Sequence, residues 1–308
     1  MVLIESAFQF FFAAEYFSYQ DKDYTVITNG SFSPNLLKAL IKKPRKIYGE
    51  DILNKVEIEA LYVSNRHSTW QIKAVKRLGV QNQMVLLEDG LGNYSPRNFL
   101  LGKRFKPTIE EFINLVKWRF NYRANVIPIR ILNKDGLVFQ CREFQRNILV
   151  KSQFGDYLAS KYRNEERPAS NSALVLSQWL TAHELIPESL YCEFLSKQIW
   201  DLKTRYDRVY LKFHPRDTKS LRESLTNIEG VILLPEKLEL LPAELLALKL
   251  NSDLYGFWST AIIYSPYLFN TKAYSLIRLL LFYSPLSDVP IVKEKFKWMS
   301  NFKKVEIL

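Results

Sequence analysis

Cysteine and histidine are scarce in this chain of 308 residues, which contains two cysteines and three histidines. Cys141 and Cys192 are far apart in the sequence, and neither stands in a spacing typical of zinc ligands. Two isolated cysteines indicate neither a disulfide framework nor a zinc site, and they favour a reducing compartment. We therefore expect a protein of the cytoplasm that does not use zinc chemistry.

Glycine-rich functional loops are also missing. The sequence contains neither a Walker-type nor a dinucleotide-type phosphate loop, and it has no Gly-x-Ser-x-Gly elbow. These absences argue against serine-triad hydrolysis and against NAD-linked hydride transfer. No apolar run reaches the roughly eighteen residues that a spanning helix needs, and no basic region precedes the first apolar run. We therefore expect neither a spanning helix nor a secretory signal.

Apolar and basic residues, in contrast, are abundant. Apolar residues make up 47% of the chain and aromatic residues 14%, which is enough for two domains and argues against disorder. The formal net charge of +11 suggests an anionic partner: a nucleotide, a nucleic acid, a membrane surface or an acidic glycan. A basic surface that only aids solubility is an equal alternative. Because no RNA-recognition, helix-turn-helix or zinc-finger pattern is present, we do not expect nucleic acid as the partner.

Strand-like and helix-like segments alternate along the first half of the chain, a pattern typical of a parallel sheet with right-handed crossovers. The predicted strands span residues 1–5, 24–28, 58–63, 84–87 and 126–132, and the predicted helices 10–17, 34–41, 69–78 and 107–122. Ser6 is expected to cap the first helix. The basic cluster around Pro44 is expected to be a solvated loop, or alternatively a site for an acidic acceptor.

The second half repeats this alternation after a polar interval at residues 151–171, where we place the domain boundary. Its predicted strands span residues 173–178, 208–213, 231–234 and 253–258, and its predicted helices 187–204, 219–226 and 242–250. Residues 273–282 fit either a strand or a buried helix. The predicted fold is therefore α/β, with Rossmann-like domains at residues 1–155 and 156–308. The basic, aromatic tail from Pro290 is expected to pack across the first domain or to contact an anionic membrane.

Ionisable side chains directly follow two of the predicted strands. Val85-Leu86-Leu87 leads into Glu88-Asp89-Gly90, and Val209–Phe213 leads into His214-Pro215. A buried parallel strand reads as a continuous apolar run, and ligands bind beyond the carboxyl ends of such strands. Gly90 permits a turn that a larger side chain would resist, and Pro215 fixes the backbone after the histidine.

Polar residues follow further strand ends at Ser177-Gln178 and Ser259-Thr260, and Ser6 and Gln9 follow the first strand. The two halves would thus bring a carboxylate and an imidazole to one cleft. Each feature also has an ordinary explanation when taken alone: an acidic turn, a structural histidine or a helix cap. Their order along the chain is what favours a catalytic site.

Three of these motifs, Glu88-Asp89-Gly90, His214-Pro215 and Ser259-Thr260, resemble the acidic-acidic-glycine, histidine-proline and serine/threonine motifs of bacterial sialyltransferases. The opening Leu3–Gln9 is similar to that of glycosyltransferase family 52 and related capsule and lipooligosaccharide sialyltransferases, although Ala7 stands where they often have proline. The resemblance spans most of the chain. It implies a GT-B-like enzyme whose two Rossmann-like domains have parallel sheets facing a central cleft.

The resemblance also implies a reaction. Sialic acid, or a related nonulosonic acid, would pass from its CMP-activated donor to a hydroxyl of a capsule or lipooligosaccharide glycan, with inversion and without a metal or other cofactor. Glu88 or Asp89 would be the base, with Glu88 favoured, because a partly desolvated carboxylate has the raised pKa that this role needs. His214, if cationic, would donate to the phosphate of the leaving CMP.

The other expected site residues divide between the two substrates. Those on the donor side are Lys212, Pro215, Ser177, Gln178, Glu244, Ser259 and Thr260, and those on the acceptor side are Ser6, Gln9, Asn65 and Gly90. Ser259 and Thr260 would hold phosphate oxygens, and Glu244 would accept from the ribose or base. The acceptor is expected to be lipid-linked, which suits peripheral contact with the inner face of the cytoplasmic membrane. A GT-B transferase with another nucleotide-sugar donor is the alternative.

Overall fold

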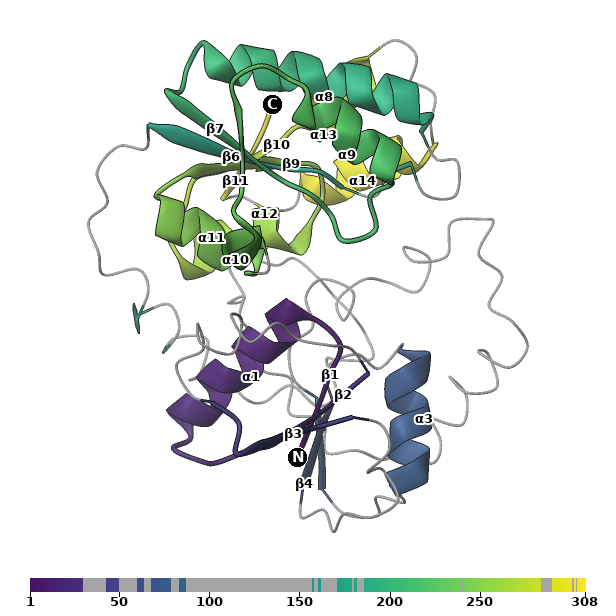
Figure 1. Ribbon diagram of the computed structural model, residues 1–308, viewed down its shortest axis with the longest axis vertical. Helices are drawn as coiled ribbons and strands as arrows, with labels where there is room; N and C mark the ends of the chain where they lie inside the picture. The colour runs from purple at the N-terminus through teal and green to yellow at the C-terminus, as the bar shows by residue number, and fades with distance from the viewer. Residues whose placement is uncertain are drawn as a thin grey trace. The chain divides into compact units, whose positions relative to one another are not determined.

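A computed structural model of the chain (Figure 1) shows two compact units, which we describe one at a time. The first comprises residues 1–133 and 139–158, and the second residues 134–138 and 159–308. The structure describes residues 1–29, 43–49, 60–63, 68–78, 83–86, 157, 160–161, 171–178, 180–181, 186–239, 241–283, 290–300, 302 and 304–308. The predicted boundary between residues 155 and 156 lies outside these ranges and stays a prediction, as do the segments predicted at 34–41, 107–122 and 126–132.

The first unit contains a parallel sheet of short strands. They are β1 (Val2–Ile4), β2 (Thr25–Thr28), β3 (Lys46–Tyr48), β4 (Ala60–Val63) and β5 (Gln83–Leu86), in the order β3-β2-β1-β4-β5. Every neighbouring pair is parallel. The order reverses between β1 and β4, because the chain builds outward to β3 and then returns to the other side of β1. The carboxyl ends of β1 and β4 therefore flank the position where such sheets bind ligands.

Helix α1 (Ala7–Tyr19) follows β1 and is buried on most sides, including Phe10, Phe11 and Phe12. A helix that is apolar all round belongs in a core. Ser6 caps it, as predicted: its Oγ accepts a hydrogen bond from the amide of Gln9 at 3.2 Å. Helix α3 spans Thr69–Leu78, which are the bounds predicted from the sequence.

The second unit contains a second parallel sheet with a doubly wound order. Its strands are β6 (Ser172–Leu176), β7 (Arg208–Lys212), β8 (Val231–Leu233), β9 (Asp253–Gly256), β10 (Ala273–Ser275) and β11 (Val305–Ile307), in the order β11-β10-β9-β6-β7-β8. Every neighbouring pair is parallel. Numbered from β6, this is the Rossmann order, with its reversal between β6 and β9. The carboxyl ends of β6 and β9 are thus the expected ligand edge.

Helices cover both faces of this second sheet. They are α8 (Glu188–Lys203), α9 (Lys219–Thr226), α10 (Glu236–Glu239), α11 (Ala243–Leu250), α12 (Thr260–Leu268), α13 (Ile277–Phe282) and α14 (Pro290–Met299). In Figure 1, α8 and α9 lie on one face, and α11 and α12 lie on the other. This distribution is what right-handed crossovers require when the strand order reverses. The core strand β6 is buried along its whole length, from Ser172 to Leu176.

The structure differs from the sequence-based elements in several places, among them the helices α10 and α12, which were not predicted. The cluster around Pro44, predicted as a loop, contains the edge strand β3, whose residues are mostly exposed and so lack an apolar alternation. The run 273–282 divides into β10 and α13, because one apolar stretch serves a strand and then a helix. The tail from Pro290 forms α14 and β11, and Val305 of β11 pairs beside Ala273 within the second sheet.

Candidate active site

Gln178 connects the two strands at which the order of the second sheet reverses. Its side-chain Oε1 accepts a hydrogen bond from the backbone amide of Trp258, beyond β9, at 3.0 Å. Its own amide donates to the hydroxyl of Tyr191 on α8 at 2.8 Å. Gln178 therefore fixes the exits of β6 and β9 to each other at the predicted ligand edge.

Ser259 and Thr260 begin helix α12 directly beyond β9. The Oγ of Ser259 accepts from the amide of Ile262 at 3.4 Å, and Thr260 is the first helical residue. The amides of a helix start and its dipole attract anions. Glycine at position 256 permits the close approach of helix and strand, because a Cβ there would lie 3.1 Å from Cγ1 and Cδ1 of Ile262. The helix cap that was the ordinary alternative for Ser259 is present, and the expected contact with phosphate stays a prediction that this geometry suits.

Lys295 adds a buried positive charge near this helix start, a feature that the sequence analysis did not identify. The residue lies on α14 and is only 7% exposed. Its Nζ is 6.0 Å from the ring centroid of Trp258, the residue before Ser259. From the sequence, the basic tail was expected to pack across the first domain or to contact a membrane, and only the packing of α14 shows that Lys295 is buried.

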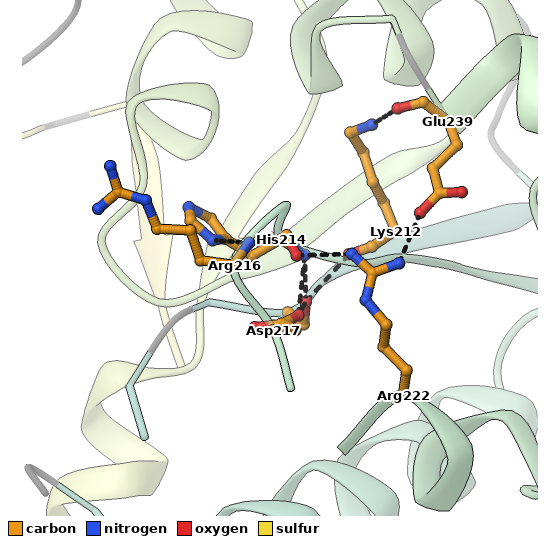
Figure 2. Close-up of polar contacts among 7 residues, drawn as sticks. Lys212, His214, Arg216, Asp217, Arg222 and Glu239 are labelled. Atoms are coloured by element: carbon orange, nitrogen blue, oxygen red, sulfur yellow. Dashed lines mark hydrogen bonds and ion pairs between the residues drawn. The ribbon is translucent and has the colours of Figure 1, made fainter. Parts of the chain in front are cut away.

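His214 follows β7 and stands at the start of a tight turn (Figure 2). The amide of Asp217 donates to the carbonyl oxygen of His214 at 3.0 Å, which closes a β-turn with Pro215 in the position that proline prefers. The amide of Arg216 donates to Nδ1 of His214 at 3.2 Å. In a neutral imidazole one nitrogen accepts and the other carries the proton. The contact therefore assigns the proton of His214 to Nε2.

The surroundings of His214 favour its neutral form. Burial lowers the pKa of His214 below its ordinary value of 6.5, and the positive charges of Arg216, Arg222 and Lys212 lower it further, while the negative charge of Asp217 raises it. At neutral pH the ring is thus uncharged. The cationic form considered from the sequence is not required for donation, since the neutral ring already carries a proton on Nε2.

The side chains of Asp217 and Ser177 fix the backbone of His214 through hydrogen bonds to its amide. The amide of His214 donates to Ser177 Oγ at 2.7 Å and to Asp217 Oδ2 at 2.8 Å. The Ser177 hydroxyl donates to the same Oδ2, and the Ser177 amide donates to the carbonyl oxygen of Lys212 at 3.0 Å. The end of β6 is thereby joined to the end of β7, next to the histidine.

Three charged side chains continue this network away from the turn (Figure 2). Arg222 on α9 donates from Nη2 to the carbonyl oxygen of His214 at 2.9 Å, and its Nη1 lies 3.4 Å from Oε1 of Glu239. Lys212 donates from Nζ to the backbone carbonyl of Glu239. Burial lowers the pKa of Lys212 to about 8, although the charges of Glu239 and Glu244 oppose this shift. The site therefore combines a neutral histidine with a positively charged surrounding.

Glu244, in the first turn of α11, is a buried carboxyl that is only 4% exposed. Burial raises its pKa from 4.5 to about 7, even though a hydrogen bond from its own backbone and the charge of Lys212 lower it in part. An acid whose pKa is raised in the folded state stabilises the fold less as the pH rises from its unfolded value through its folded one. The free energy of unfolding that the neutral Glu244 side chain supports is therefore lost as the pH rises from about 4.5 to about 7.

Replacing Glu244 with glutamine is expected to increase the free energy of unfolding above pH 7 and to change it little at pH 4. The upper limit is on the order of 3 kcal/mol, because one pKa unit corresponds to about 1.4 kcal/mol. Denaturant unfolding at a series of pH values measures the difference. Glu223→Gln, on the exposed face of α9, is the matched control. A gain that is the same at every pH would contradict the buried ionisation.

Glu5 occupies the equivalent switch point of the first sheet, directly after β1. Its Oε1 accepts from the amide of the Asn29 side chain at 3.2 Å, and its Oε2 from that of Gln71 at 3.0 Å. Its backbone amide donates to Oε1 of Gln9 at 2.7 Å. The expected residues Ser6 and Gln9 thus belong to a polar cluster whose centre, Glu5, appeared in the sequence only as the last residue of the first predicted strand.

Several predicted site residues cannot be placed. Glu88, Asp89, Gly90 and Asn65 lie outside the described residues. The structure does bring Ser177 into contact with His214 at the adjacent ends of β6 and β7, and Gln178 into contact with Trp258, the residue before Ser259. Pro215 is exposed within the His214 turn.

Within the described part of the chain, no three His, Cys, Asp or Glu side chains gather as a metal site, and metal independence stays a prediction.

Comparison with known proteins identifies a sequence family. The model of the alpha-2,8-polysialyltransferase family matches residues 18–278, which is most of the chain. No curated protein sequence matches. The family match includes His214, Glu244, Ser259 and the segment that contains Glu88.

Solved structures show the fold. UDP-GlcNAc 2-epimerase from Neisseria meningitidis, in a crystal structure with UDP-GlcNAc, matches with a TM-score of 0.50 and 12% identity over 100% of this chain and 94% of that one. The GT-B domain of a sialyltransferase from Photobacterium damselae matches with a TM-score of 0.44 and 12% identity over 100% of both chains. At such identities similarity shows the fold alone. With the two parallel sheets, it confirms the predicted α/β, GT-B-like fold class.

Among the helices within the described ranges, none is both long and apolar enough to cross a membrane.

Proposed function

Since this chain belongs to the alpha-2,8-polysialyltransferase family and is therefore a sialyltransferase-type glycosyltransferase, we propose that it transfers sialic acid, or a related nonulosonic acid, from a CMP-activated donor to a glycan hydroxyl. The observation that carries this proposal is the His214 turn at the carboxyl edge of the second sheet, beyond β7, together with the start of α12 beyond β9 at the same edge. The expected relationship to bacterial sialyltransferases is confirmed by the family match.

The donor belongs at the carboxyl edge of the second sheet. The start of α12 at Ser259 and Thr260 supplies amides and a favourable dipole for phosphate oxygens. The buried Lys295 adds positive charge near that position, and Lys212 adds a second positive charge at the end of β7, where a low-dielectric site strengthens its effect. Glu244 offers a carboxyl for the ribose or base of cytidine. These features suit a nucleoside monophosphate as the leaving group, without a metal ion.

The reaction needs one base and one stabiliser of the leaving group. Glu88, two residues beyond β5, takes the proton of the acceptor hydroxyl as its oxygen attacks the anomeric carbon of the donor sugar. The bond from that carbon to the phosphate oxygen breaks, and CMP leaves from the opposite face, which inverts the configuration. His214 donates its Nε2 proton toward the phosphate oxygen and stabilises the charge that develops there. Asp89 is the alternative base.

The acceptor is proposed to be a glycan that already ends in sialic acid, as the family description suggests. Such an acceptor is anionic, and the net charge of +11 favours its approach. At the carboxyl edge of the first sheet, Glu5, Ser6 and Gln9 offer hydrogen-bond partners for the hydroxyls of the acceptor. Asn65 and Gly90 stay candidates. A lipid-linked capsule or lipooligosaccharide acceptor, a cytoplasmic location and membrane contact through the basic tail remain parts of this proposal.

A panel of nucleotides tests the donor. We expect CMP to raise the melting temperature of the protein in EDTA as well as in magnesium, and UDP, GDP and ADP to raise it much less. Ser259→Ala serves as a variant of the phosphate position, and Ser300→Ala on the exposed end of α14 as its control. A shift with UDP or GDP but none with CMP would favour the second candidate, a GT-B transferase with another nucleotide-sugar donor.

A further inference from the structure

Asp217 is a buried carboxylate that no sequence motif marked as functional, and only 8% of it is exposed. Its Oδ2 accepts from the amide of His214 at 2.8 Å and from the hydroxyl of Ser177. Its own amide donates to the carbonyl oxygen of His214 at 3.0 Å. Asp217 thus contacts both the N–H and the C=O of the same residue, so it fixes the backbone of the histidine from two directions.

The turn that Asp217 closes also fixes the imidazole. Pro215 and Arg216 are its central residues, and the Arg216 amide reaches Nδ1 of His214 at 3.2 Å. That contact exists only while the turn keeps the Arg216 amide directed toward the ring. A loosened turn would release Nδ1 and allow the proton to occupy either nitrogen.

The charge of Asp217 shifts the pKa of His214 in the direction opposite to burial and to the neighbouring positive charges. Burial and the positive charges of Arg216, Arg222 and Lys212 lower the pKa of His214, and Asp217 alone among these neighbours raises it. Arg222 and Lys212 are themselves held by Glu239, from α10. Among the charged neighbours that shift this pKa, Asp217 is the acidic one, and its carboxylate accepts directly from the His214 amide.

We propose that Asp217, together with Ser177, is the positioning residue of His214: it locks the His214–Asp217 turn so that Nδ1 accepts from the Arg216 amide and the Nε2 proton is directed to the leaving phosphate. This inference rests on the proposed role of His214 in sialyl transfer. Asp217 touches neither substrate in this account and acts through the histidine. The Asp217 Oδ1 has no hydrogen-bond partner among the described residues, so an amide nitrogen placed there would break no described contact.

That last feature makes Asp217→Asn a sharp probe. Asparagine keeps an acceptor oxygen for the His214 amide but removes the negative charge, whereas Asp217→Ala removes both. The conservative variant therefore separates the geometric role from the electrostatic one. Asp201→Asn, an exposed aspartate on α8 that pairs with Arg205, is the matched control.

Nitrogen NMR of the imidazole rings tests the proposal directly, because the chain has three histidines and His214→Gln identifies the signal of His214. We expect wild type and Asp201→Asn to show the Nε2–H tautomer. Asp217→Asn should keep this tautomer but show a lower pKa for His214, and Asp217→Ala should show a mixture of tautomers. A mixture of tautomers in Asp217→Asn, or an unchanged tautomer in folded Asp217→Ala, would overturn the proposal.

Turnover gives the second readout. In Asp217→Ala, kcat should fall on the order of 100-fold while KM for the donor changes little, because a small displacement of a catalytic group has an effect of this size. Asp217→Asn should recover most of that loss. Equal losses in both variants would contradict positioning through geometry. The NMR result needs neither donor nor activity, so it stands apart from any failure of the proposed transferase reaction.

Discussion

The His214→Ala enzyme should lose roughly 100- to 10,000-fold in kcat for sialyl transfer, which is the range that positioned proton donors contribute. The reason is the assignment of the proton to Nε2, which leaves the ring as a donor in its neutral form. Because burial lowers the pKa of His214, this donor form persists at neutral pH. Steady-state kinetics with saturating CMP-activated donor measures the effect.

The matched control for this variant is Lys219→Ala, an exposed residue at the start of α9 in the same unit. It should keep wild-type turnover. Circular dichroism and thermal unfolding should show that both variants fold. If His214→Ala turned over near the wild-type rate while remaining folded, His214 would have no role in the departure of the nucleotide.

Replacing Glu88 with glutamine should have a comparable effect, again roughly 100- to 10,000-fold in kcat, because glutamine cannot take the proton of the acceptor hydroxyl. Glu88 lies beyond the carboxyl end of β5, the edge at which parallel sheets present functional groups. CMP binding should be unchanged, since the base belongs to the first unit and the proposed nucleotide position to the second. Kinetics and CMP titration of the same sample separate the two effects.

Asp89→Asn is the control for Glu88→Gln, because the two carboxyls are neighbours in the same motif. A large loss in Asp89→Asn and a small one in Glu88→Gln would transfer the role of base to Asp89. Near-wild-type turnover in both variants would remove the acidic motif from the mechanism.

Strands β6 to β9 and helices α8, α9 and α11 of the second unit could be predicted from the sequence because their signals are local. Strand β7 is an apolar run bounded by charged residues, and α9 follows a threonine whose hydroxyl caps it: Thr218 accepts from the amide of Leu221 at 3.1 Å. The His-Pro pair and the Ser-Thr pair mark the ends of such strands. Their positions beside Ser177 and Gln178 then follow from the strand order.

The contacts that hold the site could not be predicted, because they join residues from separate elements. From the sequence, Asp217 would be interpreted as one of the polar residues that commonly precede a helix, because it stands just before Thr218, the cap of α9. In the structure its side chain instead accepts hydrogen bonds from His214 and Ser177. Arg222 reads as a surface residue of α9, but its guanidinium reaches the carbonyl oxygen of His214. Glu5 similarly joins β1 to the Gln71 side chain of α3. Side-chain direction in such places is decided by tertiary packing.

The most direct test of the account is a transfer assay with the purified full chain. CMP-activated N-acetylneuraminic acid and a short alpha-2,8-linked sialic acid acceptor are incubated with the protein in EDTA, and products are resolved by anion-exchange chromatography with detection of released CMP. We predict longer sialic acid chains together with an equal amount of CMP, and neither product with His214→Ala. Release of nucleotide only from a UDP- or GDP-activated sugar, with no elongation from the CMP donor, would contradict the account.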